Sequence, residues 1–171
     1  MNKAPFPTML HSDADFSADS AHRYTLTRVW DFSKPKAFLI GLNPSTADHW
    51  ANDPTIRREI AFAVSWGCGT LLKGNLFAYR ATDPRAMRKA ADPIGRDNDE
   101  WLLKMYQQAD IVVACWGAGG SFMGRDMQVA LKLRGKPLKC LGLTKDFSPR
   151  HPLYLKADTQ LIDWSALTVE A

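Results

Sequence analysis

The apolar positions of this sequence form two kinds of pattern, one typical of β-strands and one typical of α-helices. Residues 24–30 alternate and are rich in β-branched and aromatic side chains, which favours a strand. Continuous apolar runs, typical of strands buried on both faces of a sheet, follow at 37–42, 71–77, 111–116 and 138–142. Between them, Asp53 and Pro54 have the properties of a helix N-cap and of a first helical residue. Helical spacing is kept by Ile56, Ile60, Ala63 and Val64, by Trp101, Leu102, Met105, Tyr106 and Ala109, and by Met127, Ala130 and Leu131.

Strands that alternate with helices predict an α/β protein with three αβα layers, in which helices cover both faces of a central four-stranded parallel sheet. The strand at 24–30 is predicted as an N-terminal β extension. Residues 1–20 are polar, small and aperiodic, so we expect a loosely ordered lead-in there. No internal repeat or linker interrupts the pattern, and residues 1–171 are therefore predicted to form a single domain.

Composition narrows the class of protein. Hydrophobic residues make up 46% of the chain and charged residues 23%, which excludes a disordered or fibrous protein. No apolar run approaches the roughly 18 residues that cross a membrane, and residues 1–7 lack the apolar core of a signal peptide. We therefore expect a cytoplasmic monomer without a membrane partner. Cys68, Cys115 and Cys140 are too widely spaced for a metal site, so we predict three buried apolar residues, no metal and no cofactor.

The net charge of +4 is unevenly distributed. Between residues 123 and 156, only Asp126 and Asp146 oppose eight basic side chains, namely Arg125, Lys132, Arg134, Lys136, Lys139, Lys145, Arg150 and Lys156. Such a segment suits a polyanionic partner, with nucleic acid as the first candidate. A solvated surface explains the same charges equally well.

Polar residues gather where the predicted strands end. They occupy residues 43–48, Asn75 and Arg80, residues 116–120, and residues 150–152. In parallel α/β sheets, ligands bind outside the carboxyl ends of the strands. The sequence therefore predicts a site at that edge of the sheet.

The motifs at these strand ends resemble those of the uracil-DNA glycosylase superfamily. The segment I-G-L-N-P-S at 40–45 is closest to the first motif of its mismatch-specific branch, and L-L-K-G-N-L at 71–76 is similar to the strand that ends in a base-reading asparagine. V-V-A-C-W-G at 112–117 and H-P-L-Y-L at 151–155 resemble its third strand and its H-P-S-P-L loop. The longer phrases G-L-N-P-S-T-A-D, N-L-F-A-Y-R-A-T-D-P and P-R-H-P-L-Y are also similar to a widespread, uncharacterised bacterial and phage family.

The resemblance implies a uracil-DNA glycosylase-like fold and a role for each matched residue. Asn43 positions a water molecule below the sugar, and His151 donates a hydrogen bond to the base oxygen as negative charge develops there. Asn75 reads the hydrogen-bonding edge of the base. Leu155, with Tyr154 beside it, fills the gap that a flipped base leaves in DNA. Taken singly, each residue has a structural alternative: the asparagines can cap loops, and the leucine can be core.

The departures from the family pattern suggest an unusual base. Ser45 stands where strict uracil enzymes carry a bulky tyrosine, which leaves room at the 5-position of a pyrimidine. Asp48 is a candidate additional acid–base group. Arg57 and Arg80 are candidate contacts to phosphate or to a bulky base substituent. The remaining predicted contacts are Phe77 on the base and Arg150 on DNA.

Together these features predict a monofunctional DNA glycosylase that hydrolyses the N-glycosidic bond of a flipped modified or damaged pyrimidine and leaves an abasic site in double- or single-stranded DNA. The four matched motifs are taken to contain no lysine that could act as an amine nucleophile, so strand cleavage by Schiff-base chemistry is not expected. Defence against phages with hypermodified DNA is compatible with the open 5-position. The alternatives are a nucleoside or nucleotide N-glycosidase and a non-catalytic DNA-binding module on the same fold.

Overall fold

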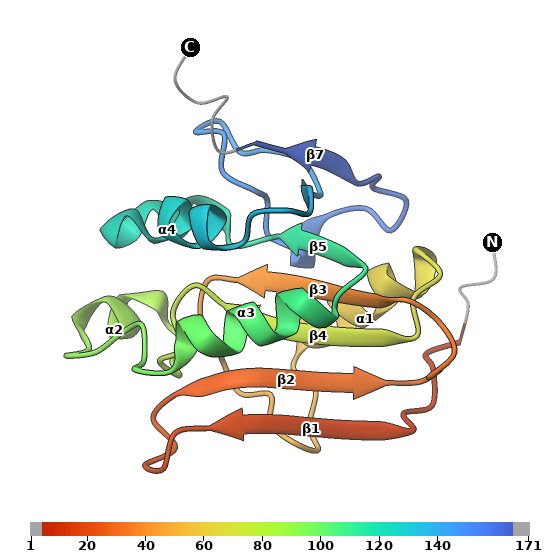
Figure 1. Cartoon of the computed structure of the whole chain (residues 1–171), viewed down its shortest axis with the longest axis horizontal. Coiled ribbons are helices and arrows are strands. Elements are labelled where there is room, and N and C mark those ends of the chain that lie inside the picture. Colours follow the sequence, from red (N-terminus) through yellow and green to blue (C-terminus); the bar gives the residue numbers. More distant parts are fainter. Residues whose placement is uncertain (1–4, 166–171) are drawn as a thin grey trace.

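A computed structural model describes residues 5–165, which form one mixed seven-stranded sheet covered by helices (Figure 1). The strand order is β1-β2-β4-β3-β5-β6-β7. The four strands β4, β3, β5 and β6 run parallel to one another. Antiparallel pairs join β1 to β2, β2 to β4 and β6 to β7. The strand bounds are β1 His11–Phe16, β2 Arg23–Val29, β3 Lys36–Gly41, β4 Thr70–Asn75, β5 Ile111–Ala114, β6 Leu138–Cys140 and β7 Ile162–Trp164.

The predicted fold class is wrong, because the sheet is not a four-stranded parallel one: it has seven strands, and antiparallel pairs join β1, β2 and β7 to it. The strand at 24–30 is not an appendage, because β2 pairs with β4 inside the same sheet. The prediction of a loosely ordered lead-in at 1–20 is also incorrect, since residues 11–16 pair with β2 as an edge strand. Neither edge strand has an apolar run: β1 reads H-S-D-A-D-F and β7 has only three residues. Periodicity detects buried strands, but it carries no information about the direction of their partners.

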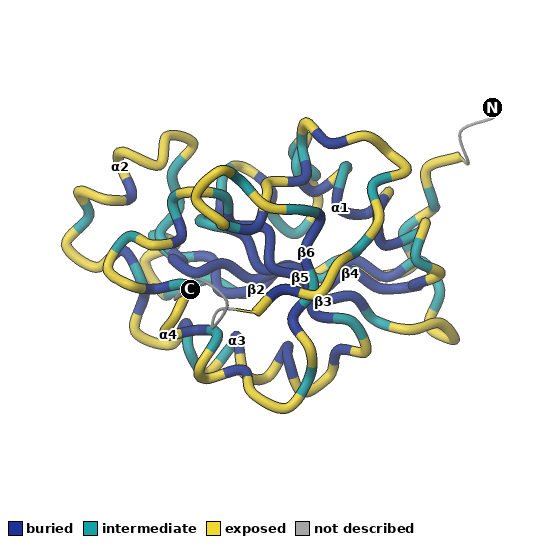
Figure 2. The backbone as a smooth tube through the Cα atoms, turned by 90° about the horizontal axis from the view of Figure 1, so that it is seen from above, coloured by how far each residue is buried: buried dark blue, intermediate teal, exposed yellow. Residues whose placement is uncertain are grey.

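Helices cover both faces of the sheet (Figure 2). The helix α1 (Pro54–Ser65) lies on one face, and α3 (Asn98–Gln108) and α4 (Arg125–Lys132) lie on the other. The remaining helical elements are α2 (Pro84–Lys89) and the short 3-10 helices η1 (Gly117–Gly124) and η2 (Pro152–Tyr154). None of the helices within the described residues has both the length and the apolar character required to cross a membrane.

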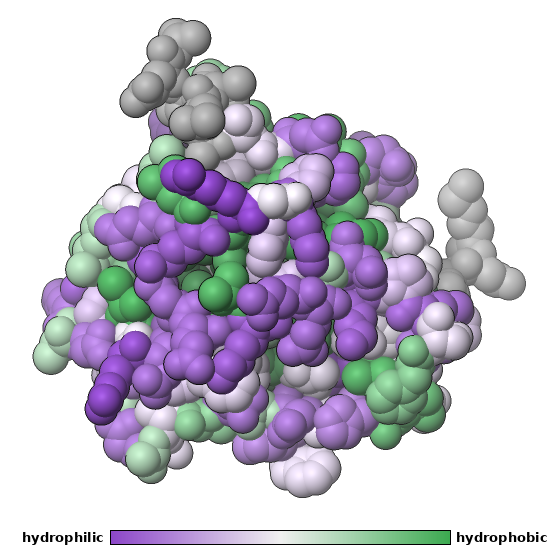
Figure 3. Space-filling model, viewed as in Figure 1, coloured by the Kyte–Doolittle hydropathy of each residue, from purple (hydrophilic) through white to green (hydrophobic). Residues whose placement is uncertain are grey.

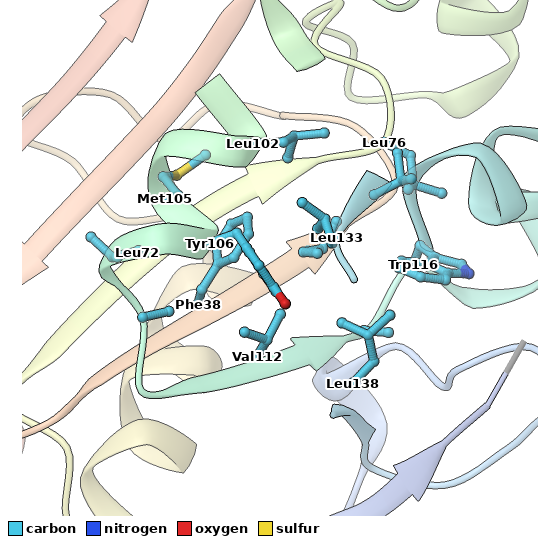
Figure 4. Packing of buried hydrophobic residues seen from close by; sticks show 14 of the residues in the cluster. Phe38, Leu72, Leu76, Leu102, Met105, Tyr106, Val112, Trp116, Leu133 and Leu138 are labelled. Atoms are coloured by element: carbon cyan, nitrogen blue, oxygen red, sulfur yellow. The ribbon is translucent and has the colours of Figure 1, made fainter. Parts of the chain in front are cut away.

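Alternating side chains of the buried strands build a separate core on each face. Phe38 and Ile40 of β3 pack on the α3 side, with Leu102 and Met105 pointing onto the strands (Figure 4). Ala37, Leu39, Leu71, Val113 and Cys115 instead face α1. The odd-numbered positions of β3 and β4 thus point toward α1, and this face carries the polar residues at the ends of both strands.

Two local predictions can be compared directly with the helices. Asp53 caps α1 as expected, because its Oδ1 accepts the backbone N–H of Ile56 at 2.9 Å. Met127, Ala130 and Leu131 lie in a helix, α4, as expected, although Met127 and Leu131 are exposed and Val129 is the buried apolar residue. The three cysteines are buried free thiols, as predicted. Figure 3 views the molecule from the side of α3, and the surface on this side is mostly hydrophilic.

Candidate functional site

A cavity of about 240 Å³ opens at the carboxyl ends of β3 and β4, on the side of the sheet covered by α1. It brings together four of the residues predicted from the sequence: Asn43, Ser45, Asn75 and His151. Trp116, at the end of β5, also lines it. The strand ends therefore meet at one site, although they are far apart in the sequence.

Gly41 opens the floor of this cavity. A Cβ atom at this position would lie 2.5 Å from Lys73 Nζ and 2.8 Å from Asn75 Oδ1, both closer than van der Waals contact allows. Gly41 and Asn75 are paired neighbours on parallel strands. The absence of a side chain on β3 therefore leaves two polar groups of β4 accessible from the cavity.

The amide of Asn43 is held in one orientation. Its Nδ2 donates to the carbonyl oxygen of Ala81 at 2.8 Å and to that of Pro44 at 3.2 Å. Because both bonds need an N–H donor, the side-chain oxygen is left as an acceptor. This is the group that could hold a water molecule or a ligand N–H in the cavity.

Asn75 presents a buried donor that the described residues leave unused. The residue is only 2% exposed, and its Nδ2 has no hydrogen-bond partner within residues 5–165. Its backbone carbonyl is fixed by Asn98 Nδ2 at 3.0 Å. Buried amide groups are almost always hydrogen-bonded, so an unused one on a cavity wall indicates a ligand or a water molecule.

His151 stands at the rim as a neutral donor. Its Nδ1 accepts the backbone N–H of Leu153 at 3.2 Å, which leaves the proton of the neutral ring on Nε2. Although the residue as a whole is exposed, desolvation of the ring lowers the pKa of His151 to about 4, and the Lys73 charge acts in the same direction. The imidazole is therefore uncharged near neutral pH.

Sequence reasoning missed a buried ion pair beside the cavity. Lys73 Nζ lies 2.6 Å from Glu59 Oε1, and both side chains are buried. Burial raises the pKa of Glu59. Desolvation alone would lower the pKa of Lys73, but its interactions with Cys115 and Glu59 raise it. The statement that the matched motifs contain no lysine is wrong, because Lys73 belongs to the second motif and lines the cavity. Two features of the sequence could have indicated this ion pair: a lysine lies within an apolar strand, and a glutamate lies on the apolar face of a helix.

Sequence reasoning also missed Arg23, which lines the cavity as Lys73 does. Its guanidinium is almost fully buried and donates from Nη1 to the Ala47 carbonyl at 2.6 Å. Burial lowers the pKa of Arg23 to about 10. Its Nε and the indole Nε1 of Trp116 have no partner within the described chain. These orphaned donors add to the polar character of the cavity wall.

Three of the residues predicted for catalysis or base binding lie outside the cavity, namely Asp48, Phe77 and Arg80. The Asp48 carboxylate accepts the backbone N–H groups of Ala51 and Trp50, which hold the pKa of Asp48 below its usual value. It therefore structures its own loop. Phe77 is fully buried in the core, and Arg80 stacks over Phe16 at 4.9 Å and donates to the Ser20 carbonyl at 3.1 Å.

The predicted DNA contacts divide into exposed and buried residues. Tyr154 is 90% exposed, and Arg57 and Arg150 are also exposed. Leu155 is buried against Phe62, so its assignment as the wedge is incorrect. The structure leaves Tyr154 as the side chain of this pair that can reach a partner.

About half of the basic segment has structural roles. Arg125 and Lys132 pair with Asp99, Lys139 pairs with Asp163, and Lys136 donates to the carbonyls of Tyr106 and Ala109. Arg134, Lys145, Arg150 and Lys156 are exposed, and their side chains form no ion pair or hydrogen bond with the described residues. Three of these four, Lys145, Arg150 and Lys156, belong to the segment that carries His151 and lie on both sides of it in the sequence.

Fold and cavity define an α/β protein with a mixed sheet and a polar site at the ends of its central parallel strands. The chain belongs to the family described as "Protein of unknown function (DUF1643)", which matches residues 23–153. The match runs from β2 to η2 and contains Asn43, Asn75 and His151. Comparison with curated proteins gives no match. Comparison with solved structures gives none either.

Proposed function

We propose that this protein is a DNA glycosylase of the cytoplasm, which hydrolyses the N-glycosidic bond of a flipped pyrimidine and leaves an abasic site. The observation that carries the proposal is the set of hydrogen-bonding roles in one cavity. Asn43 offers a fixed acceptor, Asn75 offers a buried unused donor, and His151 offers a neutral donor. These are the groups needed to orient water, read a base edge and polarise a base carbonyl.

The proposed reaction assigns one task to each group. The bond between C1′ and the base nitrogen breaks, and its electron pair leaves with the base. Asn43 holds a water molecule that adds to C1′ and releases a proton, while His151 donates to the base oxygen on which charge accumulates. Asn75 binds the base edge. The released base then takes up a proton from solvent.

Cavity size and surroundings support a base as the ligand. About 240 Å³ is below the roughly 300–1,000 Å³ of pockets that hold drug-sized ligands. Ser45 lines the same cavity, and a serine leaves more room beside a pyrimidine than a tyrosine would. Exposed Tyr154 and the free basic side chains near His151 suit DNA from which a base has been flipped. The proposal therefore includes 5-substituted pyrimidines, among them those of modified phage DNA.

The test is formation of alkali-labile abasic sites in DNA that contains uracil, mismatched thymine, 5-hydroxymethylcytosine or its glucosylated form. We expect one substrate to be cleaved and the product to disappear with Asn43→Ala and His151→Ala. His11→Ala, an exposed histidine on β1, is the matched control and should retain activity. DNA binding without any product would replace this proposal with a binding module. Cleavage of free nucleosides alone would indicate a small-molecule N-glycosidase.

A further inference from the structure

The ion pair of Lys73 and Glu59 is oriented with respect to the cavity. The ammonium group of Lys73, on β4, lines the cavity, whereas Glu59, on α1, lies behind it and is fully buried. The two groups form a dipole whose positive end is nearer the proposed ligand. A buried dipole of this kind acts in a low-dielectric environment, where its effect on a nearby charge is large.

The ammonium group of Lys73 also has an N–H donor that its protein partners do not use. An ammonium group has three N–H donors. Glu59 Oε1 at 2.6 Å takes one of them, and the Cys115 thiol at 4.0 Å is the second partner within the described chain. Gly41 leaves the side of Nζ that faces the cavity uncovered, since a Cβ there would lie 2.5 Å away. The remaining donor can therefore reach a ligand that enters beside Asn75.

We infer that Lys73, positioned by Glu59, is a catalytic residue that stabilises the negative charge on the departing base. The inference rests on the proposed function. When the bond between C1′ and the base nitrogen breaks, the electron pair spreads over the ring carbonyls, and the Lys73 ammonium donates to one of them. His151 acts from the rim and Lys73 from the floor, so the anion is bound from both sides. Lys73 forms no covalent bond with the sugar, because an ammonium ion held by a carboxylate has no free electron pair.

Three neighbouring groups define the electrostatic surroundings of this site. Arg23 adds a second buried cation to the cavity wall, and Asp53 adds a carboxylate whose oxygens accept the backbone N–H groups of Ile56 and Ala47. Cys115 is a neutral thiol, because burial raises its pKa to about 12. Lys73 Nζ and Asn75 Oδ1 lie 2.5 Å and 2.8 Å from the position of a Cβ on Gly41, so Lys73 is a cation with an open donor beside Asn75.

The kinetic test compares single-turnover excision of uracil and 5-fluorouracil. Fluorine makes the departing base a better leaving group, so it needs less help from the protein. In Lys73→Met/Glu59→Leu we expect about a 10²-fold loss with uracil and a clearly smaller loss with 5-fluorouracil. The double variant removes both charges together and so avoids an unpaired buried carboxylate. Lys139→Met, which breaks an exposed ion pair between β6 and β7, is the matched control. Equal losses on both bases would overturn the inference.

A binding measurement separates this inference from the proposed function. The free base 5-nitrouracil ionises in mildly acidic solution, because its nitro group stabilises the anion, and its absorption spectrum changes when it does so. Bound to the wild-type protein it should ionise at lower pH than in water, and the double variant should reduce that difference, leaving the part that His151 contributes. This result with no excision of any base would remove the glycosylase proposal and retain the role of Lys73 in holding a base anion. An identical spectrum in both proteins, or no binding to the wild type, would overturn the inference.

Discussion

At the scale of single residues, the site consists of polar side chains that each keep one hydrogen-bond donor or acceptor free for a ligand. Asn43 gives its amide hydrogens to the scaffold and keeps its oxygen, while His151 uses Nδ1 for Leu153 and keeps Nε2–H. Asn75 keeps a buried amide donor. Asn43 and His151 are therefore oriented before a ligand arrives, which is the condition for effective electrostatic catalysis.

The pKa of His151 leads to a prediction about pH. Because desolvation places this pKa near 4, below the usual 6.5, the neutral donor persists from pH 8 down to about pH 5. We expect the excision rate to be insensitive to His151 over that range and to fall as the ring protonates near pH 4. An NMR titration of the imidazole checks this directly. A midpoint near 6.5 would contradict it.

Two glycines on neighbouring strands should respond differently to alanine. A methyl group at Gly41 meets Lys73 Nζ and Asn75 Oδ1, whereas one at Gly74 meets Leu102 and Met105 in the core at 2.8 Å. Gly41→Ala should therefore abolish base binding and retain a folded protein. Gly74→Ala should cost about 1–3 kcal/mol of unfolding free energy through overpacking. Denaturant unfolding and ligand titration of both variants test the contrast, which equal stability losses would refute.

At the scale of elements, α1 and β4 are joined by the buried ion pair as well as by apolar packing. Removing one partner alone leaves an uncompensated charge, so Lys73→Met should cost about 3–5 kcal/mol. Lys73→Met/Glu59→Leu should cost less than that single substitution, since both charges are absent. A double-mutant cycle measured by urea unfolding checks the prediction. Additive losses would show that the two groups do not interact.

Sequence patterns predicted the buried elements better than their arrangement. The strand runs and the Asp53 cap are local features, and both are visible in residue spacing. The edge strands were missed because β1 is polar and β7 is short. Positions that follow a strand were correctly associated with the cavity for Asn43 and Asn75. Phe77 and Leu155 were misplaced because distance along the chain does not determine whether a side chain points to the cavity or to the core.

At the scale of the whole molecule, the available positive charge is smaller than the composition suggests. Four of the eight basic residues are used within the fold, namely Arg125, Lys132, Lys136 and Lys139. The other four have no described partner, and all of them except Arg134 lie close to His151 in the sequence, namely Lys145, Arg150 and Lys156. Charge counted along a sequence cannot make this distinction. A nucleic-acid surface is therefore expected around the segment that carries His151, and not across the whole basic third of the chain.

This distribution predicts the salt dependence of DNA binding. Replacing Lys145, Arg150 or Lys156 with alanine should lower the slope of log affinity against log salt by about 0.9 for each duplex phosphate that is no longer neutralised. Lys132→Ala is the matched control, because Lys132 pairs with Asp99 on the α3 side. Fluorescence anisotropy at several salt concentrations measures the slopes. Equal slopes for all variants would place the DNA elsewhere.

The connection from β3 through α1 to β4 contains most of the proposed site. Asn43, Glu59, Lys73 and Asn75 all belong to this unit, and the two charged residues are only 14 positions apart in the chain. Contacts of short sequence separation form readily, whereas His151 must wait for the segment beyond β6. During synthesis, the floor of the cavity therefore has the opportunity to assemble well before the imidazole reaches its rim. The proposed active site is complete only when His151 joins it. A partly synthesised chain therefore contains the floor of the cavity but lacks the residue that polarises the base.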